Sequence, residues 1–127
     1  MILDTNVILR FLVGDQPEQQ QQASVWFEKA EQGELKLVVK SLVVAEVCFV
    51  LESFYKKSRE EIADVLVVFL SQKWIQVEDR EVLIALWPWY KNNFHFVDSF
   101  LLAYSAINQD QVLTFDQQMV KVSKQKK

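Results

Sequence analysis

Four acidic residues stand in unusual places in this chain, either at the end of an apolar run or inside one. They are Asp4 in "MILDTN", Glu46 in "LVVAEVCFV", Asp98 in "FHFVDSFLLA" and Asp116 in "VLTFDQQ". Carboxylates that converge repel each other unless a cation lies among them, and Mg²⁺ and Mn²⁺ are the hard cations that choose oxygen ligands. A site of this kind typically supports metal-assisted hydrolysis of a phosphodiester.

A structural role is an equally good interpretation for two of these acids. Asp98 and Asp116 each stand where a helix could begin, so that either could cap backbone amides. Glu46 resists this account, because it lies inside an apolar helical pattern with no cation three or four positions away. A buried charge without a partner is costly, so Glu46 needs a partner from elsewhere in the fold.

The positions of these acids follow from the predicted elements. Short apolar runs predict four strands at "MILD", 35–39, 74–77 and 111–115, and apolar residues at helical spacing predict helices over 7–13, 17–32, 41–55, 58–72, 79–92 and 97–108. Pro88 is expected to kink or end its helix. Strands that alternate with helices imply a mainly parallel sheet covered on both faces.

The carboxyl ends of parallel strands share one edge of the sheet. Asp4 follows the first predicted strand and Asp116 follows the last, so we expect the two to lie near each other at that edge. The helices that carry Glu46 and Asp98 could begin at the same edge. With one histidine, His95, and one cysteine in the chain, a zinc site of the usual type is not expected.

Composition sets the broad class. The 127 residues predict a single domain over 1–127, and the apolar fraction of 50% excludes a disordered chain. The single cysteine and the absence of a leader or a long uncharged apolar stretch predict a cytoplasmic protein with no membrane segment. The net charge is −3, and four lysines in the last seven residues predict a frayed basic tail over 121–127.

The ordered set of motifs resembles the PIN-domain ribonucleases, most closely the VapC-type toxins of toxin–antitoxin pairs. The resemblance spans nearly the whole chain. It rests on Asp4-Thr5-Asn6 after the first strand, the segment from Ser41 to Glu46, "DSFLLA" from Asp98, and Thr114-Phe115-Asp116.

The resemblance implies a three-layer α/β/α sandwich with a mainly parallel sheet of four to five strands. It also implies a homodimer that cleaves RNA endonucleolytically with Mg²⁺ or Mn²⁺ and a metal-activated water, and that a cognate antitoxin inhibits. On this interpretation Asp4, Glu46 and Asp98 are the main metal ligands and Asp116 is a fourth or water-mediated one. Thr5, Asn6 and Thr114 would orient ligands or substrate. Arg10 and Lys40 are candidate contacts to RNA phosphates.

Two alternatives remain open. A phosphotransfer or phosphatase-like α/β domain would also place an aspartate after the first strand, although its further acidic and lysine signals are missing here. A catalytically inactive PIN-like interaction module would use its acids only as caps. One departure from the family pattern is that "MVKVSKQKK" leaves room for a very short fifth strand at best.

Overall fold

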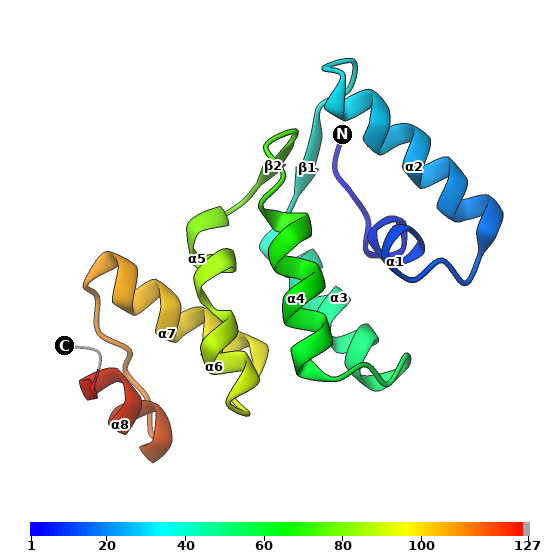
Figure 1. The fold of residues 1–127 in the computed structure, drawn as a ribbon. Coiled ribbons are helices and arrows are strands. Elements are labelled where there is room, and N and C mark those ends of the chain that lie inside the picture. Colours follow the sequence, from blue (N-terminus) through cyan, green and yellow to red (C-terminus); the bar gives the residue numbers. More distant parts are fainter. Residues whose placement is uncertain (126–127) are drawn as a thin grey trace. The chain divides into compact units, whose positions relative to one another are not determined.

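The computed structural model describes residues 1–125 in two compact units, Met1–Arg80 and Glu81–Lys127, with side chains described up to residue 123 (Figure 1). The elements of the first unit are α1 (Thr5–Val13), α2 (Pro17–Glu31), β1 (Leu37–Val39), α3 (Ser41–Ser53), α4 (Arg59–Leu70) and β2 (Ile75–Val77). Then follow α5 (Arg80–Ala85), α6 (Trp87–Lys91), α7 (Phe96–Asn108) and α8 (Gln117–Gln125). The predicted single domain over 1–127 stays a prediction.

The sheet is parallel but smaller than predicted. Leu37 pairs with Ile75 and Val39 with Val77, while the predicted first strand contributes one isolated parallel bridge between Ile2 and Val38. Within the described residues, 111–115 is not a strand. The α/β class is thus confirmed, and four to five strands are not found in the described part.

The physical reason is visible in the exposure of the predicted strand residues. Ile2 is 69% exposed, and Leu113 and Phe115 are fully exposed. An apolar run stabilises a strand by burying side chains against neighbours, and these residues do not do so.

Most predicted helices are confirmed within a few residues. The predicted helix over 79–92 is divided into α5 and α6 at Leu86, and Pro88 lies in the first turn of α6, as its missing N–H requires. Sequence reasoning missed α8. Residues 121–125, which were predicted to be part of a frayed tail, belong to this helix. Residues 126–127 lie outside the described part.

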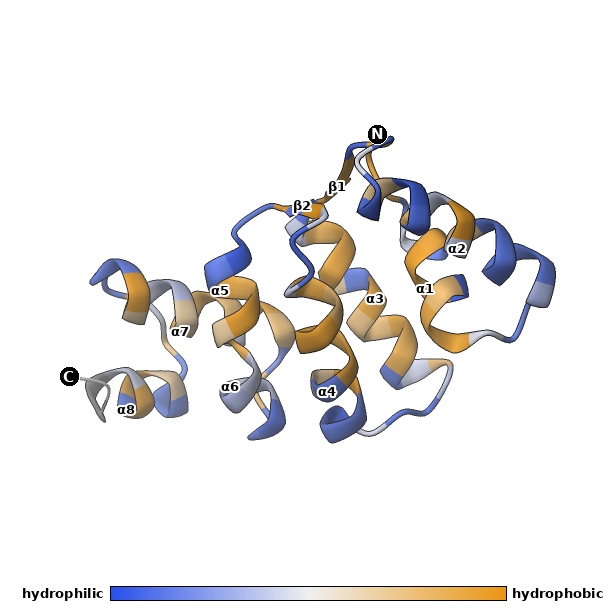
Figure 2. Cartoon of the chain, turned by 45° about the horizontal axis from the view of Figure 1, so that its top comes forward, coloured by the Kyte–Doolittle hydropathy of each residue, from blue (hydrophilic) through white to orange (hydrophobic). Residues whose placement is uncertain are grey.

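In the first unit α1 packs against α2 and α3, and α3 packs against α4. The Phe27 ring of α2 lies 4.5 Å from Phe11, 5.9 Å from Phe69 and 5.6 Å from Trp74, measured between ring centroids. Figure 2 shows α2 as largely hydrophilic, whereas α3 and α4 are largely hydrophobic. The α2 helix therefore buries one apolar side, which includes Phe27, and exposes its other side to solvent.

A glycine fixes the corner between α1 and α2. Gly14 ends α1 with φ of 75°, a left-handed conformation that favours glycine. A Cβ at this position would lie 2.8 Å from the side-chain nitrogen of Gln20, which donates to the carbonyl of Phe11. The left-handed backbone therefore favours glycine at this corner, and any larger residue would also displace the Gln20 side chain.

In the second unit α7 packs against α6 and α8. Trp87 of α6 contacts Tyr90 edge-on at 5.5 Å and Phe96 of α7 at 6.3 Å between ring centroids. Ala103 and Leu102 of α7 are buried. No helix in the described part of the chain has the length and apolar character to cross a membrane.

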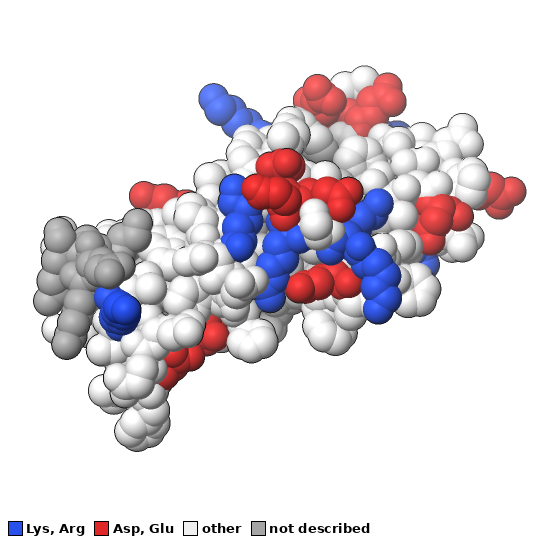
Figure 3. Space-filling model, turned by 60° about the horizontal axis from the view of Figure 1, so that its bottom comes forward, with Lys and Arg blue, Asp and Glu red and all other residues white. Residues whose placement is uncertain are grey.

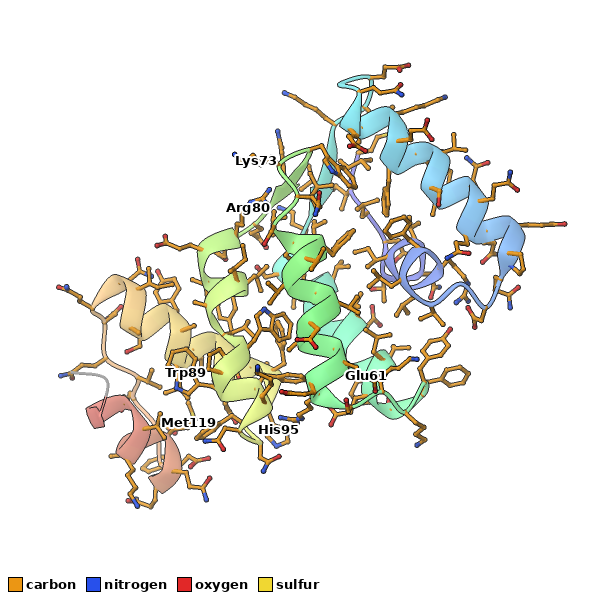
Figure 4. The ribbon with its side chains drawn as sticks, viewed as in Figure 1. Glu61, Lys73, Arg80, Trp89, His95 and Met119 are labelled. Carbon is orange, nitrogen blue, oxygen red and sulfur yellow. The ribbon has the colours of Figure 1, made fainter. Side chains whose placement is uncertain are left out.

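Arg80 joins the end of α4 to β2. Its guanidinium donates to the carbonyl oxygens of Leu70 at 2.6 Å, of Gln72 at 2.9 Å and of Ile75. Figure 4 shows Arg80 beside the strands, close to Lys73 on the preceding turn. One planar, always charged group thus satisfies carbonyls from three positions.

We expect Arg80→Met to lower the free energy of unfolding by about 2 to 4 kcal/mol, because the carbonyls lose their charged donor. The measurement is urea unfolding followed by circular dichroism. Lys73→Ala is the control, since Lys73 is exposed and the change should stay within about 0.5 kcal/mol. Equal midpoints for the two variants would contradict the role of Arg80.

Cys48 is a core residue that should not react in the native protein. Its side chain is 1% exposed, and burial strongly raises the pKa of the thiol. A thiol-reactive chromophore at pH 8 should therefore label Cys48 only after denaturant is added. Rapid stoichiometric labelling without denaturant would show that α3 is not packed as described.

Candidate functional site

Asp4 lies at the end of the short N-terminal ladder and begins α1. The backbone N–H of Leu3 donates to Val38 at 2.9 Å, which aligns this segment with β1. Asp4 then takes an extended conformation, and its Oδ1 accepts from the backbone N–H of Thr5 at 2.8 Å. The side chain is exposed. Asp4 is therefore an N-cap residue with a carboxylate that also faces solvent.

Glu46 lies on the exposed side of α3. Its Oε1 accepts a short hydrogen bond from the hydroxyl of Thr5, a residue that is 6% exposed. The expected partner from elsewhere in the fold is thus found, 41 positions earlier in the chain. The expectation that Glu46 is buried among apolar residues is wrong. Apolar residues precede and follow it in the sequence, but the buried Val47 lies on another face of the helix.

Thr5 therefore brings two predicted ligands together. Its backbone N–H contacts Asp4 and its hydroxyl contacts Glu46. Hydrogen bonds to carboxylate oxygens fix the orientation of the two side chains. Asn6 follows in the first turn of α1 and is exposed.

The start of α3 is held by an acid that sequence reasoning missed. Lys40 gives α3 no side-chain cap, and Glu78 supplies one instead by accepting from the backbone N–H of Ser41 at 2.9 Å. This hydrogen bond lowers the pKa of Glu78, and the Lys40 ammonium at 3.5 Å acts in the same direction. The Ser41 hydroxyl also donates to the carbonyl of Glu78. A position directly after a strand was the only signal available in the sequence.

Asp98 lies in the first turn of α7 and is partly exposed. His95 is the N-cap residue of this helix and makes no side-chain cap hydrogen bond. The buried Ser99 donates its hydroxyl to the carbonyl of His95 at 2.9 Å. Among the described residues, the Asp98 carboxylate has no hydrogen bond or ion pair, so the capping interpretation is not supported for Asp98.

Asp116 does act as a cap. Its Oδ1 accepts from the backbone N–H groups of Gln118 at 2.9 Å and Met119 at 3.2 Å, at the start of α8. The backbone N–H of Asp116 donates to the hydroxyl of Thr114 at 3.0 Å, and that hydroxyl lies 3.9 Å from the sulfur of Met119. Figure 4 labels Met119 on α8 and His95 before α7. Thr114 and Asp116 together therefore organise the local turn.

The four predicted ligands are divided between the two units. Asp4 and Glu46 meet at Thr5 in the first unit, and Asp98 and Asp116 belong to the second. Within either unit, the described residues include no cluster of three or more His, Cys, Asp or Glu side chains suited to a metal ion. The donors themselves fit a hard divalent cation, because they are carboxylates and those of Asp4 and Glu46 face solvent.

The two candidate phosphate contacts already have internal partners. Arg10 donates to Gln19 at 2.8 Å and to the hydroxyl of Tyr55 at 3.1 Å, and it lies 3.7 Å from Asp15. Lys40 pairs with Glu78 as described above. Both residues stay predictions as RNA contacts, and each now has a structural role as well.

Comparison with known proteins identifies the family of the chain. The sequence model of the PIN domain family matches residues 1–125. A VapC ribonuclease of Aquifex aeolicus (strain VF5) is 36% identical over 77 residues, an alignment that covers 61% of this chain and 56% of that protein. The chain thus spans about half the length of this relative. No solved structure matches. Because the family match extends over nearly the whole length, the chain belongs to the PIN domain family, and its likeness within that family is to the VapC type.

Proposed function

We propose that the chain is a divalent-metal-dependent endoribonuclease, the toxin of a toxin–antitoxin pair. One observation carries the proposal. Thr5 joins the carboxylates of Asp4 and Glu46, which are far apart in sequence and both exposed. Structural acids need no such junction, whereas a hydrolytic site needs carboxylates held together and open to substrate. Membership of the PIN domain family and the likeness to a VapC ribonuclease add to this support.

We propose Asp4, Glu46 and Asp98 as the main ligands of Mg²⁺ or Mn²⁺, and Asp116 as a fourth or water-mediated ligand. A bound divalent cation supplies Lewis acidity, which makes water a better nucleophile and offsets the charge of the phosphate. The Thr5 hydroxyl holds one oxygen of Glu46 and leaves the other available. The Asp98 carboxylate has no partner among the described residues, so binding a cation there breaks no existing contact.

The partners follow from the same likeness. We propose RNA as the substrate, a cognate antitoxin protein as the inhibitor, a homodimer as the working form and the cytoplasm as its place. The Aquifex relative is named as a VapC ribonuclease, and this supports the RNA substrate. Family membership also favours this proposal over the phosphotransfer alternative.

One rival keeps specific support. Asp4 and Asp116 both act as helix caps, as a metal-free interaction module would require. The decisive experiment is cleavage of a structured RNA pool by purified protein, free of co-purifying inhibitor, with Mg²⁺, Mn²⁺ or EDTA. We expect cleavage with either metal and none in EDTA. No cleavage, together with no heat on titration of Mn²⁺ into the protein, would favour the interaction module.

Asp4→Asn and Asp98→Asn should each reduce cleavage to the level seen in EDTA, because each removes an anionic ligand while keeping a similar shape. The two variants are compared with the native protein in the same assay. Thermal unfolding of each variant confirms that it is folded. Cleavage that survives both substitutions would point to a contaminant or to another site.

Thr5→Val should weaken Mn²⁺ binding and cleavage by roughly 10- to 100-fold, because Glu46 loses the hydroxyl that orients it. Thr5→Ser keeps that hydroxyl and should restore most of both. Calorimetric titration of Mn²⁺ and the cleavage rate are measured for each variant. If Thr5→Val and Thr5→Ser behave alike, the hydroxyl does not orient Glu46.

A further inference from the structure

The loop between α3 and α4 presents an aromatic ring and two lysines to solvent. Phe54 is 72% exposed, although phenylalanine is usually buried, and Lys56 and Lys57 are exposed as well. Phe54 stands against Tyr55 edge-on, with ring centroids 4.9 Å apart. A ring beside cationic side chains is the combination that binds single-stranded nucleic acid by stacking and by phosphate contact.

The backbone of this loop is held in place. The N–H groups of Phe54 and Tyr55 donate to the carbonyl of Val50 at 2.9 and 3.2 Å, and that of Lys57 donates to Leu51 at 2.9 Å. Lys56 takes a left-handed conformation, with φ of 57°, which turns the chain at the end of α3. The Phe54 ring and the two lysines are therefore presented by a fixed turn.

The Tyr55 hydroxyl adds a second anchor. It donates to Asp15 at 2.9 Å and accepts from Arg10 at 3.1 Å. Burial and the hydrogen bond to Asp15 both raise the pKa of Tyr55, so the hydroxyl stays protonated at neutral pH. Arg10, a candidate phosphate contact in the sequence, thus serves to position the loop.

Two acidic residues near the loop already have an ion-pair or hydrogen-bond partner. Glu52 pairs with Arg59 at 3.1 Å, and Glu61 accepts from the backbone N–H of Ser58. Figure 3 shows basic and acidic side chains interspersed on the face that is turned forward, and Figure 4 labels Glu61 at the start of α4. Glu61 keeps its charge, because the hydrogen bonds with Ser58 lower the pKa of this carboxyl group and Lys57 is close enough to help. Among the described residues, neither Lys56 nor Lys57 forms an ion pair within 4.0 Å, so both ammonium groups can contact an external anion.

We propose that Phe54, Lys56 and Lys57 form a contact site for single-stranded RNA, with a base stacked on the Phe54 ring and phosphates bound by the two lysines. The inference rests on the proposed ribonuclease function and names a substrate contact for it. Phe54 follows Glu46 by eight positions, about 12 Å along the α3 axis. One short single strand can therefore reach both the loop and the predicted ligands on α3.

The test measures RNA binding in EDTA, so that it does not depend on cleavage. A short fluorescein-labelled single-stranded RNA without self-complementarity is titrated with full-length protein, and anisotropy is followed between about 50 and 200 mM salt. Lys56→Ala with Lys57→Ala should weaken binding and make the salt slope shallower by about 1.4. Lys36→Ala with Lys73→Ala is the matched control, because these two lysines are also exposed.

Phe54→Leu removes the ring and keeps an apolar side chain. It should weaken binding about fivefold or more while the salt slope stays unchanged, since stacking involves no counterion. The melting temperature of each variant is recorded, so that a loss of binding in a folded protein is assigned to the loop.

Several outcomes would overturn the inference: no RNA binding by the native protein, equal losses in both lysine pairs, or no loss in either. Sedimentation with anionic phosphatidylserine vesicles is run in parallel. A loss of vesicle binding without a loss of RNA binding would assign the loop to membranes and overturn the inference as well. Failure of cleavage with RNA binding as predicted would leave the contact site standing and refute the nuclease alone.

Discussion

The arrangement of the first unit depends on the hydrogen bonds of Thr5. A buried threonine at the first position of α1 donates its amide to Asp4 and its hydroxyl to Glu46, and so it joins the start of one helix to the middle of another. Both carboxylates lie at exposed positions rather than in the apolar interior. The two acids are held in place and stay open to solvent, which is the condition for ligand binding.

Long-range polar contacts also define the frame around this junction. Glu78 holds the beginning of α3 and Arg80 ties β2 to the end of α4, so that two residues shortly after one strand fix two different helices. These contacts help to position the helices, which strand pairing would do in a larger sheet. With two paired strands and one bridge among the described residues, side chains and caps carry much of the positioning of the first unit.

Sequence reasoning succeeded where the signal was local. The helices and the Pro88 break could be identified from the chain alone, and so could the need of Glu46 for a distant partner. The roles of the four acids stay predictions. The identity of that partner could not, because Thr5 lies 41 positions away and nothing in its spacing points to α3. The strand at 111–115 was predicted from branched residues, but propensity describes a buried pleated surface, and Leu113 and Phe115 are exposed.

The two contacts between α1 and α3 also constrain helical phase. Thr5 reaches Glu46, and Arg10, five positions later, reaches the Tyr55 hydroxyl just beyond the end of α3. Each residue of an α-helix turns the side chain by about 100°. Inserting or deleting a single residue between Thr5 and Arg10 would therefore point one of them away from α3. Substitutions in this stretch can keep the register of the two helices, whereas changes in its length cannot.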